Sequence, residues 1–307
     1  MLLARVRAVQ TMAFKALKMG RRLLGTQIAE SGHRPLIFWS LVAMKFKLFP
    51  AALGLAAAMA MTCSIPAHAE DTLAAVMAKK SISIGIPTDF PPFGFVGTDF
   101  KPEGLDVQVA KLIAEKLGVQ ANLVPVSTPN RIPYLQTGKI DLIVSALGKT
   151  PERAKVIDFT MPYSPFYLGV FGPKDMSIKN FADLGGKTVS VTRGTIQADI
   201  LQEKAPPTLK IERFQDDAST ISAFVTGQTE LLATGVSAAD AAIKKNPKRN
   251  AELKLVLKDS PNFVGVRKGD SALLDKVNAI LRQARADGTL NGYSEHWLGR
   301  GLGNLPE

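Results

Sequence analysis

The sequence predicts an α/β protein in which mostly parallel sheets are flanked by helices. Short apolar runs with a two-residue period alternate with runs of helical period, a pattern typical of strands joined by helices. The chain has 307 residues, of which 46% are hydrophobic and 21% charged, as in a globular protein large enough for two domains. After residue 69 no apolar run reaches the length of a membrane span.

The first half of the chain shows the alternation most clearly. Residues 81–86, SISIGI, have the period of a strand. Residues 105–117 carry apolar side chains at helical spacing, and Gly118 is a suitable C-cap. Residues 87–102 form a loop rich in Pro, Gly and Phe. Further strands are expected at 121–126, 140–147 and 168–171, and a short helix from Asn130 to about Gly138.

The second half repeats the pattern. Strands are expected at 188–191, 209–214, 230–234 and 253–257, and helices at 195–203, 218–225 and 271–287. In open sheets of this kind ligands bind at the carboxyl ends of the strands. The segments after Ile86, Leu147 and Val191 are therefore the places to look for a site.

Residues 44–69 are expected to be a signal peptide. Met44 opens a short positive segment, residues 48–61 are apolar, and an A-x-A motif ends at Ala69. The motif predicts cleavage after Ala69 and export to the periplasm. A transmembrane anchor is the alternative, but Pro50 and the cleavage motif argue against it.

Residues 1–43 are expected to be an over-long gene start or an extended N-terminus of the signal peptide. Residues 1–69 hold nine of the 38 Lys and Arg and one of the 27 acidic residues, so the remainder carries 29 basic and 26 acidic residues. The overall charge of +11 thus falls to +3 in the expected mature chain. A nucleic-acid-binding domain carries its basic excess on the folded part, so no nucleic-acid partner is expected.

Cys63, the only cysteine, lies inside the expected signal peptide, where Thr62 fits a lipoprotein cleavage motif poorly. The mature chain would then have no disulfide, no thiolate metal site and no cysteine nucleophile. His296 is its single histidine, and no metal-ligand cluster, cofactor motif or nucleophile motif is present in the sequence. We therefore expect neither a metal nor a cofactor, and the signals for an enzyme are weak.

Three segments carry residues that suit ligand binding. The first is the loop that contains Phe90 and Phe93, where Pro91 and Pro92 limit the freedom of the chain. An aromatic ring held there is either a surface for a ligand or a local packing anchor. The residues alone leave both roles open for Phe90 and favour the packing role for Phe93.

The second segment runs from Ser145 to Arg153. A strand ends at this point, and Thr150 with Pro151 is a helix start, with the cap followed by proline at the first helical position. The corner offers free backbone N–H groups, a hydroxyl and the guanidinium of Arg153, which can hold a carboxylate with two bonds. From spacing alone, a surface arginine on a solvated helix is the simpler interpretation.

The third segment is the glycine turn at Gly194, followed by Thr195, Ile196 and Gln197. It leads from a strand into a helix whose first N–H groups can accept an anion. An ordinary glycine turn is the alternative interpretation of this motif.

Taken in order, these segments resemble the periplasmic amino-acid-binding proteins of ABC importers, extracellular solute-binding protein family 3. The resemblance covers nearly all of residues 75–300. It rests on DFPPF, GLDVQVAKLIAEKLG, KIDLIVSALGKTPERAKVIDFTMPY, GTIQ and ADGTLNGYSEHWLG, of which the TPER–DFTMPY block is the most specific.

The resemblance implies a two-lobed, type II periplasmic-binding-protein-like fold joined by two hinge strands. Lobe 1 would be residues 70–168 plus 263–307 and lobe 2 residues 169–262, with hinges near 168–171 and 262–266. The protein would be a monomer that captures an amino acid or a related small carboxylate and delivers it to the membrane permease of an ABC transporter. A sensory receptor that uses the same fold is an alternative.

The resemblance also assigns roles to residues. Phe90 would cover the ligand side chain, and Arg153 would clamp the α-carboxylate. Ser145 and Gly148 would contribute from lobe 1. The second lobe would contribute Thr195, Ile196 and Gln197.

One departure from the family concerns the acid that holds the ligand's ammonium group, because Gly235 stands at its position. A buried ammonium without a carboxylate is costly. Either Asp217 or Asp240 replaces that acid, or the ligand has no α-amino group. The rival from another class is a cyclohexadienyl dehydratase, an enzyme of the same fold, for which Glu103 and Glu152 are the nearby acids.

Overall fold

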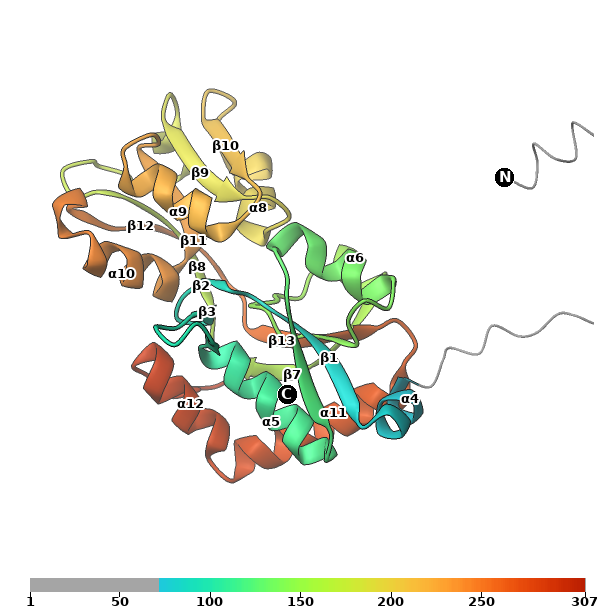
Figure 1. The fold of residues 1–307 in the computed structure, drawn as a ribbon. Coiled ribbons are helices and arrows are strands. Elements are labelled where there is room, and N and C mark those ends of the chain that lie inside the picture. Colours follow the sequence, from blue (N-terminus) through green and yellow to red (C-terminus); the bar gives the residue numbers. More distant parts are fainter. Residues whose placement is uncertain (1–71, 307) are drawn as a thin grey trace, which may run out of the picture. The chain divides into compact units, whose positions relative to one another are not determined.

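The computed structural model describes residues 72–306, which contain two five-stranded sheets (Figure 1). The signal peptide expected at 44–69 and the start expected at 1–43 lie outside the described residues. No helix within 72–306 is long and apolar enough to cross a membrane. The α/β, two-lobed fold class predicted from the sequence is confirmed.

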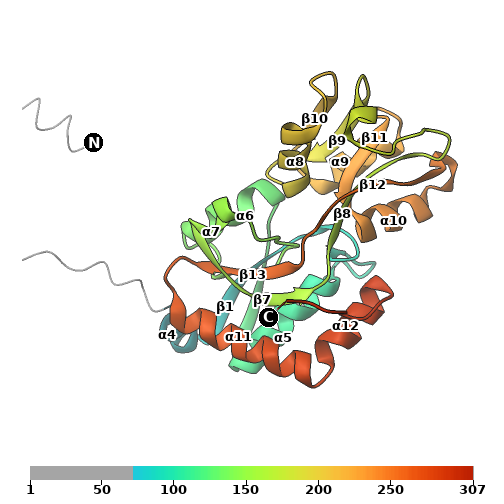
Figure 2. The same ribbon diagram turned by 180° about the vertical axis from the view of Figure 1, so that it is seen from behind.

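The first sheet has the strand order β5-β1-β6-β13-β7. Its strands are β1 (Ser81–Ile86), β5 (Gln120–Pro125), β6 (Leu142–Ile143), β7 (Ile157–Ser164) and β13 (Asn262–Arg267). The helices of this lobe are α4 (Thr72–Lys79), α5 (Leu105–Leu117), α6 (Arg131–Gln136), α7 (Pro151–Ala154), α11 (Ser271–Ala286) and α12 (Thr289–Leu298). Figure 2 shows α5, α11 and α12 gathered at the bottom of the view, below this sheet.

The second sheet has the order β10-β9-β11-β8-β12. Its strands are β8 (Tyr167–Pro173), β9 (Thr188–Thr192), β10 (Lys210–Phe214), β11 (Leu231–Gly235) and β12 (Ala251–Asp259). Its helices are α8 (Ile196–Lys204), α9 (Asp217–Val225) and α10 (Val236–Lys245). Val191 of β9 and Leu231 of β11 pack in one cluster with Leu201 of α8. Leu232 of β11 packs in a second cluster with Phe224 of α9 and Ala239 of α10.

Both sheets are mixed, although the sequence predicts mostly parallel ones. Three strands of each sheet run parallel, β5-β1-β6 in the first and β10-β9-β11 in the second. The other two strands of each sheet pair antiparallel. The physical reason is the connectivity: β7 leads out to β8 in the other sheet and β12 leads back to β13, so the strands that pair beside the two crossings run in opposite directions.

The chain crosses between the lobes at residues 165–166 and 260–261, outside regular strands. The predicted hinges at 168–171 and 262–266 instead lie inside β8 and β13, in the two sheets. The two crossings are bonded to each other, because the Ser260 N–H donates to the Phe166 carbonyl at 2.8 Å. The predicted lobe boundaries at 168/169 and 262/263 lie within a few residues of these crossings and stay a prediction.

Some elements differ from the sequence-based expectation. The strand expected at 140–147 has only two residues as β6, and the chain cannot remain extended to its expected end because Ala146 adopts a positive φ of 41°. The edge strand β7 was not predicted from the sequence, because Pro162 argues against a strand. At the edge of a sheet, however, proline is tolerated. The loop expected at 87–102 contains a small sheet of β2 (Asp89–Phe90), β3 (Gly94–Val96) and β4 (Pro102–Glu103).

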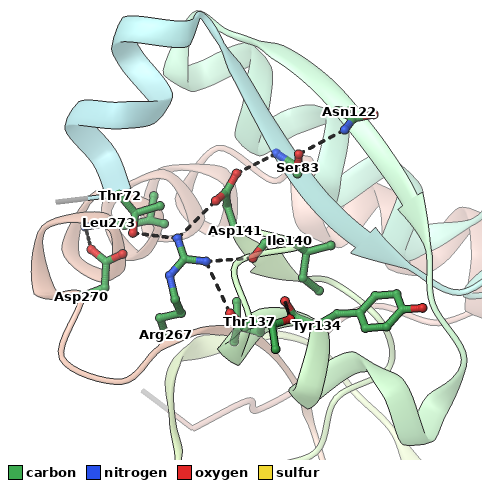
Figure 3. Close-up of polar contacts among 11 residues, drawn as sticks. Thr72, Ser83, Asn122, Tyr134, Thr137, Ile140, Asp141, Arg267, Asp270 and Leu273 are labelled. Carbon is green, nitrogen blue, oxygen red and sulfur yellow. Dashed lines mark hydrogen bonds and ion pairs between the residues drawn. The ribbon is translucent and has the colours of Figure 1, made fainter. Parts of the chain in front are cut away.

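An arginine ties four segments of the first lobe together (Figure 3). Nη2 of Arg267 donates to Thr72 Oγ1 at 2.8 Å and lies 3.2 Å from Asp141 Oδ1. Its Nη1 donates to the Ile140 carbonyl at 2.9 Å. The other oxygen of Asp141 accepts from the Ser83 N–H at 3.0 Å. One side chain on β13 therefore fixes the start of α4, the start of β6 and strand β1.

Candidate ligand site

A pocket lies where the two lobes face each other, with about 30 Å³ of free space. Its lining comes from both lobes and from both crossing segments: Pro87, Phe90, Thr128, Arg131, Ser145, Ala146, Gly148, Arg153, Phe166, Leu168, Thr195, Ile196, Gln197, Asp217 and Ser260. Seven of the eight site residues predicted from the sequence are among them: Phe90, Ser145, Gly148, Arg153, Thr195, Ile196 and Gln197. The eighth, Gly235, is not part of the lining.

Three phenylalanines build the apolar wall of the pocket. The rings of Phe90 and Phe93 stack at 5.6 Å, and Phe166 meets both edge-on, at 6.3 and 5.1 Å. Phe90 and Phe166 line the pocket, whereas Phe93 is fully buried behind them. Phe90 therefore packs against Phe93 and also lines the pocket, and its role as a surface for a ligand stays a prediction.

Arg153 sits in the short helix α7, whose N-cap is Thr150, with the Thr150 hydroxyl accepting the Arg153 N–H at 3.2 Å. Its Nη1 donates to the Gly148 carbonyl at 2.7 Å, and its Nη2 reaches across to the Gly194 carbonyl of the other lobe at 2.9 Å. Burial lowers the pKa of the guanidinium. The arginine thus joins the lobes at the pocket rather than pointing into solvent.

Helix α8 begins at the opposite side of the pocket. Thr195 is its N-cap and accepts the Ala198 N–H at 3.3 Å, while the Thr195 hydroxyl donates to the Thr192 carbonyl at 2.7 Å. Ile196 and Gln197 occupy the first turn, where backbone N–H groups have no partner inside the helix. These N–H groups and the positive end of the helix favour an anion near Arg153.

Two buried charged residues complete the polar part of the lining. Asp217 accepts hydrogen bonds from the Thr192 hydroxyl at 2.6 Å and, across the lobes, from the Thr128 hydroxyl at 3.1 Å. Burial raises the pKa of Asp217 to about 6, against the effect of these bonds and of Arg131. Arg131 donates from Nη1 to the carbonyls of Ser145 and Ala146, and burial lowers its pKa to about 9.

Behind the pocket, Asp106 holds the segment that includes Ser145 and Ala146. The carboxylate is fully buried and accepts from the Ala146 N–H and from the Tyr163 hydroxyl, both at 2.7 Å. Burial raises the pKa of Asp106 to about 7. Asp106 does not line the pocket, so its effect on a ligand passes through the backbone of Ala146.

Gly235 ends β11 beside the aromatic wall. A Cβ atom there would lie 2.4 Å from Cε2 of Phe166 and 3.4 Å from Cζ of Phe90. An acidic side chain does not fit at this position unless Phe166 moves, which is the physical reason for glycine. Of the two acids considered as its replacement, Asp217 lines the pocket, while Asp240 lies on α10 outside the lining.

Sequence reasoning missed Thr128 and Arg131, which follow β5. The signal was available, because β5 runs parallel to β1 and its carboxyl end must lie at the same edge of the sheet. It also missed Phe166 and Ser260, which come from the lobe crossings. Nothing in their local sequence marks them, since their position depends on how the two sheets are joined.

Residues considered for other chemistry lie elsewhere. His296 is exposed and its ring packs edge-on to Trp297 at 4.8 Å. Neither Glu103 nor Glu152 lines the pocket. Among residues 72–306, no group of three or more His, Cys, Asp or Glu is placed to hold a metal ion.

Comparison with known proteins gives a consistent result. The model of the family "Bacterial extracellular solute-binding proteins, family 3" matches residues 82–300. The glutamine-binding protein of an ABC transporter from Bacillus subtilis (strain 168) is 32% identical over 237 residues, 75% of this chain and 85% of that protein.

Two solved structures are similar over most of the chain. The solute receptor for L-cysteine of Neisseria gonorrhoeae is 35% identical, with a TM-score of 0.69, over 74% of this chain and 93% of the other. An ancestral amino-acid-binding protein, a precursor of cyclohexadienyl dehydratase, is 32% identical, with a TM-score of 0.67, over 74% and 98%.

Proposed function

Because this chain belongs to family 3 of the bacterial extracellular solute-binding proteins, we propose that it holds an amino acid between its lobes through Arg153. The observation that carries the proposal is the position of this guanidinium. It is held in lobe 1 by the Gly148 carbonyl and reaches the start of α8 in lobe 2. A cation and a helix N-terminus that face the same small space suit a carboxylate.

The α-carboxylate would accept hydrogen bonds from Arg153 and from the backbone N–H groups of Ile196 and Gln197. Nη2 of Arg153 now donates to the Gly194 carbonyl. A bound carboxylate would take the place of that carbonyl and, as a charged acceptor, would form a stronger bond. The hydroxyl of Ser145 lies in the same lining and adds a further donor.

Asp217 would take the α-ammonium group in place of the acid that Phe166 excludes at Gly235. Its two oxygens accept only from hydroxyl groups in the side-chain contacts described, so capacity for a cationic donor remains. With a pKa of about 6, Asp217 is mostly ionised at neutral pH. The ligand side chain would then lie against Phe90 and Phe166.

Ligand binding would shift the population of open and closed forms toward the closed one, since the ligand touches both lobes. The closed form would deliver the amino acid to the permease of an ABC transporter. We also propose export with cleavage after Ala69, to the periplasm, and a monomer in solution. Family membership supports the export, and the acidic and basic balance of the expected mature chain is consistent with a soluble carrier.

The test is isothermal titration of the purified protein with L-amino acids and with the corresponding acids that lack the α-amino group. Arg153→Ala should abolish binding of every ligand that has a carboxylate, whereas Arg193→Ala, at an exposed neighbouring arginine, should bind normally. Asp217→Asn should lower the affinity for α-amino acids roughly ten-fold and leave the affinity for the analogues without an α-amino group nearly unchanged. Unaltered affinity in Arg153→Ala would place the ligand elsewhere.

A second function, dehydration of a prephenate-like substrate, is favoured by one observation. A dehydratase needs an acid to protonate the leaving hydroxyl, and the raised pKa of Asp217 provides a partly protonated acid in the pocket. Relatives that match most of this chain are named as binding proteins or receptors, so we propose that the chain binds without turnover. Incubation of the protein with prephenate checks this. If the unaltered protein forms a dehydration product and Asp217→Asn forms none, the chain is an enzyme instead.

A further inference from the structure

A second hollow lies on lobe 1. This cavity of about 600 Å³ lies beside the edge strand β7 and is called the β7 cavity here. Strands β7 and β13, helix α11 and the segment before α7 supply its principal side chains, which are Lys149, Phe159, Phe263, Asn278, Arg282 and Arg285. None of its lining residues is shared with the amino-acid pocket.

The β7 cavity is strongly cationic. Lys149, Arg282 and Arg285 line it, and no Asp or Glu does. None of the three takes part in an ion pair among residues 72–306. The nearby Asp158 is already engaged by Lys268 at 2.6 Å. Three like charges that line one cavity without an ion-pair partner repel one another, so an anion between them is favoured.

Hydrogen bonds hold two polar side chains of the cavity lining, Arg285 and Asn278, in place. Nη2 of Arg285 donates to the Pro162 carbonyl at 3.0 Å, but its Nε is buried without a hydrogen-bond partner. Asn278 is oriented by its Oδ1, which accepts the Met161 N–H at 2.7 Å. Its amide NH2 group adds a further donor to the cationic lining.

The remaining wall is aromatic. The rings of Phe159 and Phe263 meet edge-on at 5.9 Å, and Nζ of Lys149 lies 6.0 Å from the Phe159 ring centroid. Cations around a pair of rings suit a molecule that joins a flat apolar body to a negative group. A simple inorganic anion would leave the rings without a contact.

We propose that the β7 cavity binds a small organic anion with a flat apolar body, at a site separate from the amino-acid pocket. The two sites lie on neighbouring residues of one segment, since Gly148 lines the pocket and Lys149 lines the cavity. The Phe263 N–H is bonded to the Leu147 carbonyl at 2.9 Å, which connects the cavity wall to the same segment.

The probe is phthalate, an aromatic dianion at neutral pH, titrated into the protein while backbone amide NMR signals are followed. The titration uses Arg153→Ala, so that a carboxylate site in the amino-acid pocket does not compete. The signals of Lys149, Phe159 and Phe263 should shift in a saturable way. The neutral diamide of the same acid should cause no such shift.

Arg282→Ala in the same background should weaken phthalate binding roughly ten-fold, because a charged donor is lost. Arg282 makes no side-chain contact that the fold needs among those described, so the variant should fold. Lys276→Ala removes an exposed cation of the same helix outside the cavity and should leave the affinity unchanged.

Three results would overturn the proposal: no saturable shift at millimolar phthalate, shifts confined to Thr195 and Gln197, or equal losses in Arg282→Ala and Lys276→Ala. Each is independent of amino-acid binding by the unaltered protein. The proposal and the function of the amino-acid pocket therefore fail separately.

Discussion

Ala146 and Gly235 show how single residues shape the pocket between the lobes. Ala146 has a φ of +41°, a conformation that costs a non-glycine residue about 1 kcal/mol or more. Its N–H bond to the buried Asp106 holds that conformation. Gly235 leaves room for Phe166, which in turn forms the wall. Neither Asp106 nor Gly235 lines the pocket, yet both determine its shape.

Gly235→Ala should weaken amino-acid binding roughly ten-fold and cost about 1–3 kcal/mol of stability, because a Cβ at 2.4 Å forces the Phe166 ring to move. Titration calorimetry and thermal unfolding measure the two effects. The control is Gly292→Ala in α12, where nothing lies within 4 Å of the added carbon. The reasoning fails if both variants bind equally well.

Asp106→Asn should change how stability depends on pH. The pKa of Asp106 is about 7 in the folded protein, against 3.8 for an ordinary Asp, so the folded state retains the proton longer. This group therefore favours folding below about pH 4, and that contribution is lost as pH rises to about 7. The stability of the variant relative to the unaltered protein should rise across this window, as measured by denaturant unfolding. Parallel curves would contradict the assignment.

At the scale of elements, one carboxylate connects the two lobes. Asp89 in β2 accepts the N–H groups of Asp217 and Ala218, at 2.9 and 3.2 Å, and so satisfies the N-terminus of α9 in the other lobe. Thr128 and Arg153 make further bonds across the lobes, to Asp217 and Gly194. These contacts need the two lobes to lie against each other, so a separation of the lobes would break them.

Asp89→Ala should therefore weaken ligand binding about five-fold, since a helix cap is worth about 1 kcal/mol. Small-angle scattering without ligand should show a larger average radius than for the unaltered protein. Asp99→Ala is the matched control, because that exposed carboxylate contacts only Lys101 of its own hairpin in the bonds described. Equal affinities in the two variants would show that the cap has no effect on closure.

At the scale of the whole molecule, stability depends on contacts between distant parts of the sequence. Arg267 joins Thr72, Ile140 and Asp141, which lie more than a hundred residues away along the chain (Figure 3). Lobe 1 is discontinuous, since its sheet takes strands from both sides of lobe 2. The arginine therefore helps to join the returning chain to the first part of the same lobe.

Arg267→Ala should lower the free energy of unfolding by about 2–3 kcal/mol, because it leaves the half-buried Asp141 and a backbone carbonyl without their partner. Lys268→Ala breaks an exposed pair with Asp158 and should cost less than about 1 kcal/mol. Chemical denaturation followed by circular dichroism compares the two. A loss no larger than in the lysine variant would mean that Arg267 has no special role.

The sequence by itself determined the α/β class and most helices and strands, because hydrophobic period, caps and glycine turns act over a few residues, as at Thr150, Thr195 and Gly118. The seven predicted residues that line one pocket came from the resemblance to the family, since their spacing alone left simpler interpretations open. Only the tertiary structure decided that β7 is a strand at a sheet edge and that Arg131, Phe166 and Asp217 meet at the site. Those positions depend on how the two sheets are ordered and joined. The same holds for burial, for the bonds between the lobes and for the exclusion of a side chain at Gly235, because each arises between segments far apart in the chain.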